Sequence, residues 1–279
     1  MDTSPHDECV RRFREINPLI TDYVINIWVD RVYNFLPELS WSIIEIGGLC
    51  RMYVRRQHLI GEERLIVIAG VANIRGQNQP QRQLIGVKQR HIHEKYRHHT
   101  ANTTTKRPIN SFPHDIALLE LRTPIKLKKH VATKTILVKT EGILKESGHK
   151  AVVMGWGDIG EEVDNPITSP NLLYTILDVW TAAGCRSGNR AGMDLRHVIC
   201  AERFDTGPCP GDSGGPLVMK VESKRTGAKY RIQIGVVSKA PPMCNYDGRP
   251  GIYMNVGYYC SWIERTTKIK TLCQNIKAL

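Results

Sequence analysis

The stretch of sequence that decides the fold is Cys209-Pro210-Gly211-Asp212-Ser213-Gly214-Gly215-Pro216-Leu217-Val218. A serine hydroxyl is a weak nucleophile at its ordinary pKa, so a protein that uses one presents it on a tight turn beside N–H donors. The surrounding glycines permit left-handed or crowded backbone, which lets the N–H groups of Gly211 and Ser213 point at one spot. Asp212 is too close to Ser213 in sequence to orient a base. The stretch therefore predicts a reactive serine beside an anion-binding site, in preference to an ordinary glycine-rich turn before an apolar strand.

Composition favours a mostly β chain of one large domain or two small ones. The 279 residues include 23 Gly and 15 Pro, and short β-branched runs such as 66–68, 152–153 and 234–237 lie between turn signals. No run of 18 apolar residues occurs, so we expect no transmembrane helix. Residues 1–8 are acidic and lack the basic and apolar regions of a signal peptide.

The net charge of +12 is concentrated at 82–107 and 122–134. Solvated loops explain these clusters better than a polyanion or nucleic-acid site, because aromatic residues do not interleave with the charges. A metal site is also disfavoured. The histidines at 91, 93, 98 and 99 have no acidic or cysteine partner nearby, and the chain has no C-x-x-C pair. We therefore expect no metal and no cofactor.

Two motifs resemble those of one protein family. Gly211–Pro216 is similar to the nucleophile loop of trypsin- and chymotrypsin-like serine proteases. Pro113-His114-Asp115-Ile116-Ala117-Leu118-Leu119 resembles the motif around the family's triad aspartate, and Asp115 lies 98 residues before Ser213, a spacing typical of the family. The resemblance covers roughly residues 51–266.

The resemblance implies an all-β fold of two six-stranded antiparallel Greek-key β-barrels, with the site in the cleft between them and a C-terminal helix outside. It places an unassigned N-terminal segment at 1–39 and the protease domain at 40–268. Within that domain we expect the first barrel at about 40–140, the second at about 148–262 and the helix at about 258–270.

The resemblance also implies a catalytic triad of Ser213, Asp115 and a histidine, with Gly211 and Ser213 as the oxyanion hole. His58 is the favoured base because it follows the apolar pair Tyr53 and Val54, as the family's histidine does. Arg56, Gln57 and Leu59 stand where the family has two alanines and a cysteine. In a rival alignment Leu49 replaces the histidine and no base exists. The sequence leaves both alignments open and favours His58.

The residues matching the family's substrate pocket are Gly207, Ser238, Lys239, Ala240 and Gly251. Trypsin-like enzymes carry an aspartate six residues before the serine to pair with substrate Lys or Arg, and here that position is Gly207. Ser238-Lys239-Ala240 stands where the family has Ser-Trp-Gly. An apolar or small substrate side chain is therefore expected, and a weakened pocket is the other reading.

By the same resemblance, the cysteines form the bridges Cys185–Cys200 and Cys209–Cys244. The family has a third bridge, and both of its cysteines are replaced here, by Ala151 and Met219. The remaining four cysteines, at 9, 50, 260 and 273, receive no assigned partner. Bridges form in an oxidising compartment, so the pattern predicts a secreted protein even though no signal peptide is visible.

Family members are activated when a newly cut N-terminal ammonium pairs with the aspartate before the nucleophile, here Asp212. No Ile-Val-Gly-Gly-like cleavage sequence is visible. The leading hypothesis is a secreted serine endopeptidase, made as a zymogen, that acts on protein or peptide substrates and is open to protease inhibitors. The alternative is a catalytically inactive homologue that binds or regulates other proteins. A basic protein that binds polyanions is a weaker third reading.

Overall fold

The computed structural model describes most of the second half of the chain and selected segments of the first. The described ranges are 14–15, 27–29, 41–44, 66–76, 79–80, 82–96, 114–124, 136–139, 148–159, 167–187, 194–223, 226–240, 244, 249–269 and 273–275.

Six strands of the second half close into a barrel. In hydrogen-bonding order they are β8 (Lys150–Gly155), β9 (Leu173–Val179), β10 (Val198–Glu202), β13 (Gly251–Asn255), β12 (Lys229–Lys239) and β11 (Pro216–Glu222), and β11 pairs back with β8. Every pair around this ring is antiparallel. Closure leaves no free sheet edge within the ring. The expected antiparallel second barrel is confirmed.

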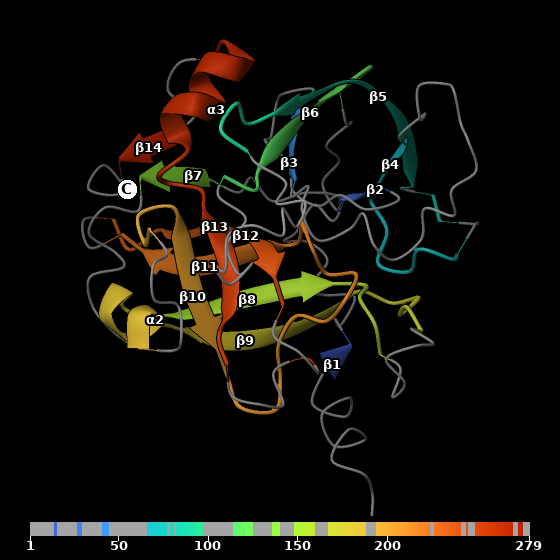
Figure 1. Ribbon diagram of the computed structural model, residues 1–279. Helices are drawn as coiled ribbons and strands as arrows, with labels where there is room; N and C mark the ends of the chain where they lie inside the picture. Colours follow the sequence, from blue (N-terminus) through green and yellow to red (C-terminus); the bar gives the residue numbers. More distant parts are fainter. Residues whose placement is uncertain are drawn as a thin grey trace, which may run out of the picture.

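Five of the described strands of the first half form a separate antiparallel sheet. Its order is β2 (Ile27–Val29), β4 (Ile66–Ala69), β5 (Gln83–Ile92), β6 (Ala117–Leu121) and β3 (Trp41–Ile44). Figure 1 shows these strands packed beside the barrel of the second half. β2 lies within the segment 1–39 that the sequence left unassigned, and it pairs with β4 of the expected first barrel.

Three short strands extend the barrel in ways that the sequence did not indicate. β1 (Arg14–Glu15) pairs with β9. β7 (Ile136–Lys139) and β14 (Cys273–Asn275) pair with each other, and β7 pairs with β12; these two pairings are parallel. β7 falls in the range expected for the first barrel, yet it hydrogen-bonds to the second. The connector between the barrels and the tail after the helix thus both join the second barrel.

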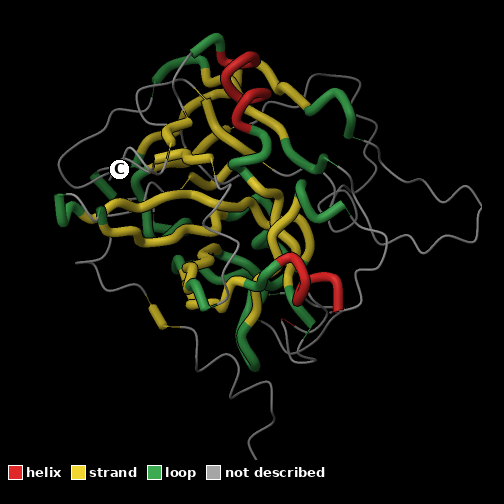
Figure 2. The backbone as a smooth tube through the Cα atoms, turned by 90° about the vertical axis from the view of Figure 1, so that its left-hand side faces the viewer, coloured by secondary structure: helices red, strands yellow, loops and turns green. Residues whose placement is uncertain are grey.

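Two described helices lie at opposite ends of the strand core, as Figure 2 shows: α2 (Ala182–Ser187) and α3 (Cys260–Thr267). α3 is the expected C-terminal helix. It ends at Lys268, whose left-handed backbone stops the helix. No described helix is long and apolar enough to cross a bilayer.

The two sheets are joined by one continuous apolar cluster. Ile116, directly before β6, and Leu118, within β6, are fully buried and pack against the second barrel and α3. Their partners there are Val198, Val236, Ile252, Met254, Val256, Tyr259, Cys260, Trp262, Ile263 and Cys273. One face of β6 packs against this cluster and the opposite face is covered by the first sheet, so β6 is buried on both faces. Asp115, two residues before β6, is therefore carried into the interface between the sheets.

The interior of the second barrel explains how the chain tolerates its lost cysteine pair. Ala151 on β8 and Met219 on β11 are directly opposite each other in the register, and both are buried in the barrel core. A small side chain faces a long flexible one, which fills the space that a bridge would occupy. The two residues that replace the cysteine pair thus pack against each other in the barrel core.

This opposition makes a specific prediction. Because directly opposed residues in antiparallel strands have Cα atoms about 4.5–5.5 Å apart, Ala151→Cys with Met219→Cys should form a disulfide. The oxidised double variant should lose two thiols and melt above its own reduced form, by thiol titration and calorimetry. Each single variant is the control. Two free thiols in the folded double variant would contradict the register.

Candidate active site

The nucleophile loop is built by two glycines in left-handed backbone and by hydrogen bonds to β12. Gly211 and Gly214 have φ of 97° and 83°, which residues with a Cβ rarely adopt. The Gly214 N–H donates to the Val237 carbonyl (2.8 Å), and the Val237 N–H donates to Gly215 (2.9 Å). Ser213 directly precedes these two anchored glycines. Its hydroxyl and N–H donate to no other group in the described part of the chain.

The carboxylate expected to orient the base is fully buried and hydrogen-bonded. Asp115 has no exposed surface, and its Oδ2 accepts a hydrogen bond of 2.8 Å from the Ser238 hydroxyl. An unpaired buried carboxylate is costly, so this hydrogen bond stabilises the charged form where it lies.

A β-bulge aims Ser238 at the carboxylate. The register of β12 against β13 shifts between Val237 and Lys239, which leaves Ser238 at the irregularity. Val236 faces the cluster between the sheets while Val237 faces the barrel core. Ser238 returns to the side of Val236 and reaches Asp115 from there. The nucleophile loop and the acid are thus attached to the consecutive residues Val237 and Ser238.

Asp212 lies beneath the loop, held by main-chain donors. Its Oδ1 accepts from the Gly157 N–H (2.7 Å) and its Oδ2 from the Cys209 N–H (2.9 Å). A Cβ on Gly155 or Gly157 would collide with this carboxylate, so the sequence Gly-Trp-Gly is required by close approach. Burial raises the pKa of Asp212 to about 6 despite the two N–H donors, and the charge of Asp158 adds to the rise. Among the described residues no cation pairs with it.

The residues matching the substrate pocket lie around the same strand. Gly207 is buried at the approach to the nucleophile loop, and Lys239 and Ala240 are half-buried at the end of β12. Gly251 begins β13, and a Cβ there would press on the ring of Tyr253 at 3.2 Å. Asp205, two residues before Gly207, has left-handed backbone and stands outside the matching position.

Three disulfides brace the second barrel. Two are those that the resemblance implied, Cys185–Cys200 and Cys209–Cys244, with Cα separations of 5.6 and 4.6 Å. The third, Cys260–Cys273, joins the start of α3 to β14 with a Cα separation of 5.8 Å. The sequence reasoning missed it, and a spacing of 13 residues around a predicted helix is the signal that could have indicated it. Cys9 and Cys50 lie outside the described residues.

The expected base also lies outside the described residues. His58 and its rival position Leu49 both fall there, so the structure describes the acid and the nucleophile but not the group between them. No cluster of three or more His, Cys, Asp or Glu side chains that could hold a metal ion occurs in the described ranges.

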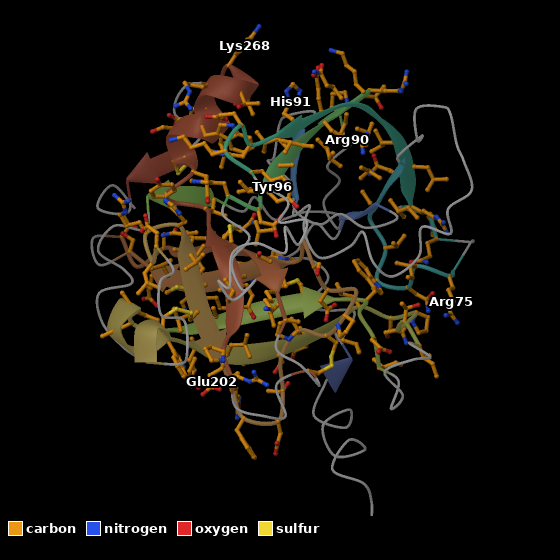
Figure 3. The ribbon with its side chains drawn as sticks, viewed as in Figure 1. Arg75, Arg90, His91, Tyr96, Glu202 and Lys268 are labelled. Atoms are coloured by element: carbon orange, nitrogen blue, oxygen red, sulfur yellow. A yellow bond between two sulfur atoms is a disulfide. The ribbon has the colours of Figure 1, made fainter. Side chains whose placement is uncertain are left out.

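The basic residues of β5 are partly neutralised. Lys88 and His91 both contact the carboxylate of Glu120 on β6. Figure 3 shows Arg90 and His91 on β5 and Lys268 at the end of α3, at the same end of the molecule. Residues 97–107 and 125–134 of the two basic stretches lie outside the described residues.

Comparisons with known proteins agree with this architecture. The sequence model of the family described as Trypsin matches residues 57–263. The Drosophila melanogaster protein named Serine protease grass is 30% identical over 185 residues, which cover 65% of this chain and 45% of that protein. A Mus musculus tryptase is 33% identical over 157 residues, 54% of each chain. The chain thus spans about half the length of these curated relatives.

A solved structure gives the same fold. Mouse neuropsin, described as a serine protease expressed in the limbic system of the brain, superposes with a TM-score of 0.68 at 20% identity, covering 91% of this chain and 98% of that one. The fold is therefore that of the chymotrypsin-like two-barrel proteins. Because the family match spans most of the chain, this protein belongs to the trypsin family of serine proteases.

The hydrogen bond between Ser238 and Asp115 predicts a stability loss. Ser238→Ala leaves the buried carboxylate without this donor, which should lower the free energy of unfolding by about 1–3 kcal/mol. Ser238→Thr, which keeps a hydroxyl, is the matched control and should lose less. Chemical denaturation at neutral pH measures both. Equal stability of Ser238→Ala and the parent would show that the hydrogen bond contributes nothing.

The raised pKa of Asp212 predicts a pH dependence with a definite sign. The folded state holds this proton up to about pH 6 while an unfolded aspartate loses it near 4, so the contribution to stability is lost as pH rises through 6. The contribution of Asp212 to the free energy of unfolding should therefore be larger at pH 5 than at pH 7. In Asp212→Asn the melting temperature should no longer show this pH dependence. The variant can still be less stable overall, because its amide cannot accept both hydrogen bonds. If the melting temperature of Asp212→Asn changed with pH as that of the parent does, the pH dependence could not be assigned to Asp212.

Proposed function

We propose that this protein is a serine endopeptidase of the trypsin and chymotrypsin class. The observation that carries the proposal is the attachment of the nucleophile loop and the buried acid to consecutive residues of β12, through Val237 and Ser238. Any buried carboxylate needs a donor, but this donor lies one residue after the anchor of the nucleophile loop and so fixes the acid relative to Ser213. An acid held in a fixed position is what a Ser-His pair requires.

In this proposal His58 takes the proton of the Ser213 hydroxyl as its oxygen bonds to the peptide carbonyl carbon. The N–H groups of Gly211 and Ser213 stabilise the oxyanion, and His58 then returns the proton to the leaving amine as the C–N bond breaks. Water repeats the sequence on the acyl-enzyme. Asp115 holds the imidazole in the required tautomer and stabilises its charged form.

Asp212 supports an activation step. Its carboxylate is buried, has a raised pKa and forms no ion pair with any described cation. A cationic partner would restore the charged form and fix the turn that carries Ser213. The ammonium of a newly cut N-terminus is the partner that we propose, so the chain is made as a zymogen. The three disulfides support an extracellular location.

The pocket residues favour an apolar or small side chain on the amino side of the cleaved bond. Gly207 offers no charge to a substrate Lys or Arg, and burying such a cation without a partner is costly. We expect kcat/KM for substrates with Phe or Leu at this position to exceed that for Arg by about tenfold or more, measured with peptides that differ only there. A preference for Arg would contradict this reading of the pocket.

A catalytically inactive homologue is the competing function. Lys239 is the observation that favours it, because a half-buried lysine stands where the family presents a flat surface to the substrate backbone. Ala240 further narrows the entrance.

Labelling by a fluorophosphonate distinguishes the two functions. The proteolytically processed protein should react at Ser213 and hydrolyse peptides, and Ser213→Ala should abolish both. Ser261→Ala, which removes an exposed serine on α3, is the matched control and should retain both. Absence of labelling after correct N-terminal processing would refute the endopeptidase and leave the inactive homologue.

A further inference from the structure

Three histidines from distant parts of the sequence pack ring to ring beside Asp115. His93 follows β5, His114 precedes Asp115, and His197 precedes β10. The rings of His93 and His114 stack with centroids 4.7 Å apart and planes within 5° of parallel. The ring of His197 lies 4.4 Å from that of His114, tilted by 40°. We call these three side chains the histidine stack.

Aromatic side chains enclose the stack on the side of α3. The Tyr259 hydroxyl lies 3.2 Å from His114 Nδ1, and the Tyr258 hydroxyl lies 3.0 Å from His197 Nε2. The ring of Trp262 lies 5.0 Å from that of His93. A cavity of about 180 Å³ opens between His93, His114 and these aromatic rings. The cavity thus lies against two rings of the stack, those of His93 and His114.

Charged groups face the stack from every neighbouring segment, and together they do not favour protonation of its histidines. Glu94 and Lys95 follow β5, Asp194 and Arg196 flank His197, and Arg265 comes from α3. Burial is the largest cause that lowers the pKa of His93, with Lys95, Arg265 and His197 adding to it and Glu94 opposing it. The neighbouring Asp194, at 3.4 Å, only partly offsets the burial that lowers the pKa of His197.

His114, at the centre of the stack, is the least easily protonated. Burial lowers its pKa to about 4, and the two neighbouring imidazoles and Lys95 add to the effect. An imidazolium has two N–H groups and accepts no hydrogen bond, so a protonated His114 would donate from Nδ1 to the Tyr259 hydroxyl. The proton of that hydroxyl is directed at the Met254 sulfur, 3.8 Å away.

The stack is joined to Asp115 through the main chain. His114 has left-handed backbone with φ of 58°, a conformation that a histidine keeps only when its surroundings hold it. The Ile116 N–H donates to the His114 carbonyl (2.8 Å), and the His93 N–H donates to the Ile116 carbonyl (3.1 Å). Asp115 lies between these two anchored residues. Its position therefore depends on where His93 and His114 are held.

We propose that the histidine stack is an acid-sensitive switch that holds Asp115 in place while its rings are neutral and releases it when they are protonated. Neutral imidazoles attract one another as stacked rings do, whereas two charged rings 4.4–4.7 Å apart repel. Separation of the rings frees the strained turn at His114 and withdraws Asp115 from Ser238. Regulation of peptide hydrolysis by this switch rests on the proposed function; the movement of Asp115 does not.

The sign of the pH dependence follows from the lowered pKa values. Between about pH 6.5 and 4 the unfolded chain binds protons at these histidines that the folded chain does not, so stability falls as pH falls. This is opposite in sign to the effect of Asp212. Variants at the two sites therefore separate the two contributions.

The test compares the wild type with His114→Asn between pH 7.5 and 5. Asparagine tolerates left-handed backbone, so this variant removes the titrating ring and keeps the turn. His149→Asn, which changes a histidine at the start of β8, is the control. The wild-type melting temperature should fall by at least about 3 °C more than that of His114→Asn over this range, and the control should follow the wild type. If His114→Asn does not fold, His93→Phe keeps a stacked ring without its charge and replaces it.

Hydrogen exchange on the same proteins tests the link to Asp115. After correction for intrinsic rates, exchange at Asp115 and Ile116 should increase in the wild type at pH 5 and remain slow in the variant. The proposal would be overturned if the melting temperatures of the wild type and His114→Asn fell equally with pH, or if exchange at Asp115 and Ile116 did not depend on pH. If peptide hydrolysis is measurable, its loss at low pH should be reduced in the variant. Absence of hydrolysis at every pH would instead count against the proposed function and leave the exchange result to decide the switch.

Discussion

The buried hydrogen bond from Ser238 to Asp115 is the constraint on which the site depends. Asp115 enters the interface between the sheets because β6 is buried on both faces, and a carboxylate can remain there only if a donor meets it. The bulge in β12 supplies that donor one residue after the strand anchors the nucleophile loop. A single strand therefore sets the position of the loop relative to the acid, and the two come from halves of the chain that fold as separate sheets.

Electrostatics around this constraint are balanced between two groups with opposite pH responses. Asp212 is buried, pairs with no cation among the described residues, and favours its protonated form up to about pH 6. The histidine stack is buried without sufficient negative charge and favours its neutral form. One group lies under the nucleophile and the other behind the acid. Both parts of the site thus contain groups whose neutral form is favoured by burial.

The features that could be predicted from sequence were those encoded by short contiguous motifs. The nucleophile loop, the motif around Asp115 and the strands β4, β5, β6 and β8 are recognisable because each depends on neighbours in sequence. The pair Ala151 and Met219 could also be inferred, since the two replacements compensate each other across β8 and β11. These residues suffice for the fold class and the family.

Features assembled from distant segments could not be predicted. The histidine stack joins residues 93, 114 and 197, and the sequence grouped His93 only with its neighbours in the basic loop. The parallel pairing of β7 with β12 and β14, and the bridge between Cys260 and Cys273, depend on where the connector and the tail return to the barrel. The base stays a prediction, because the segment around His58 departs from the family motif and lies outside the described residues.

The most direct test of the central claim is a crystal structure of the processed protein with a phosphonate bound at Ser213. The decisive measurement is the distance from the imidazole of His58 to the Asp115 carboxylate and to the Ser213 oxygen. We expect both distances to be about 3 Å, with Ser238 still donating to Asp115. A leucine or an empty space between Asp115 and Ser213 would contradict it, because the acid would then have no base to orient.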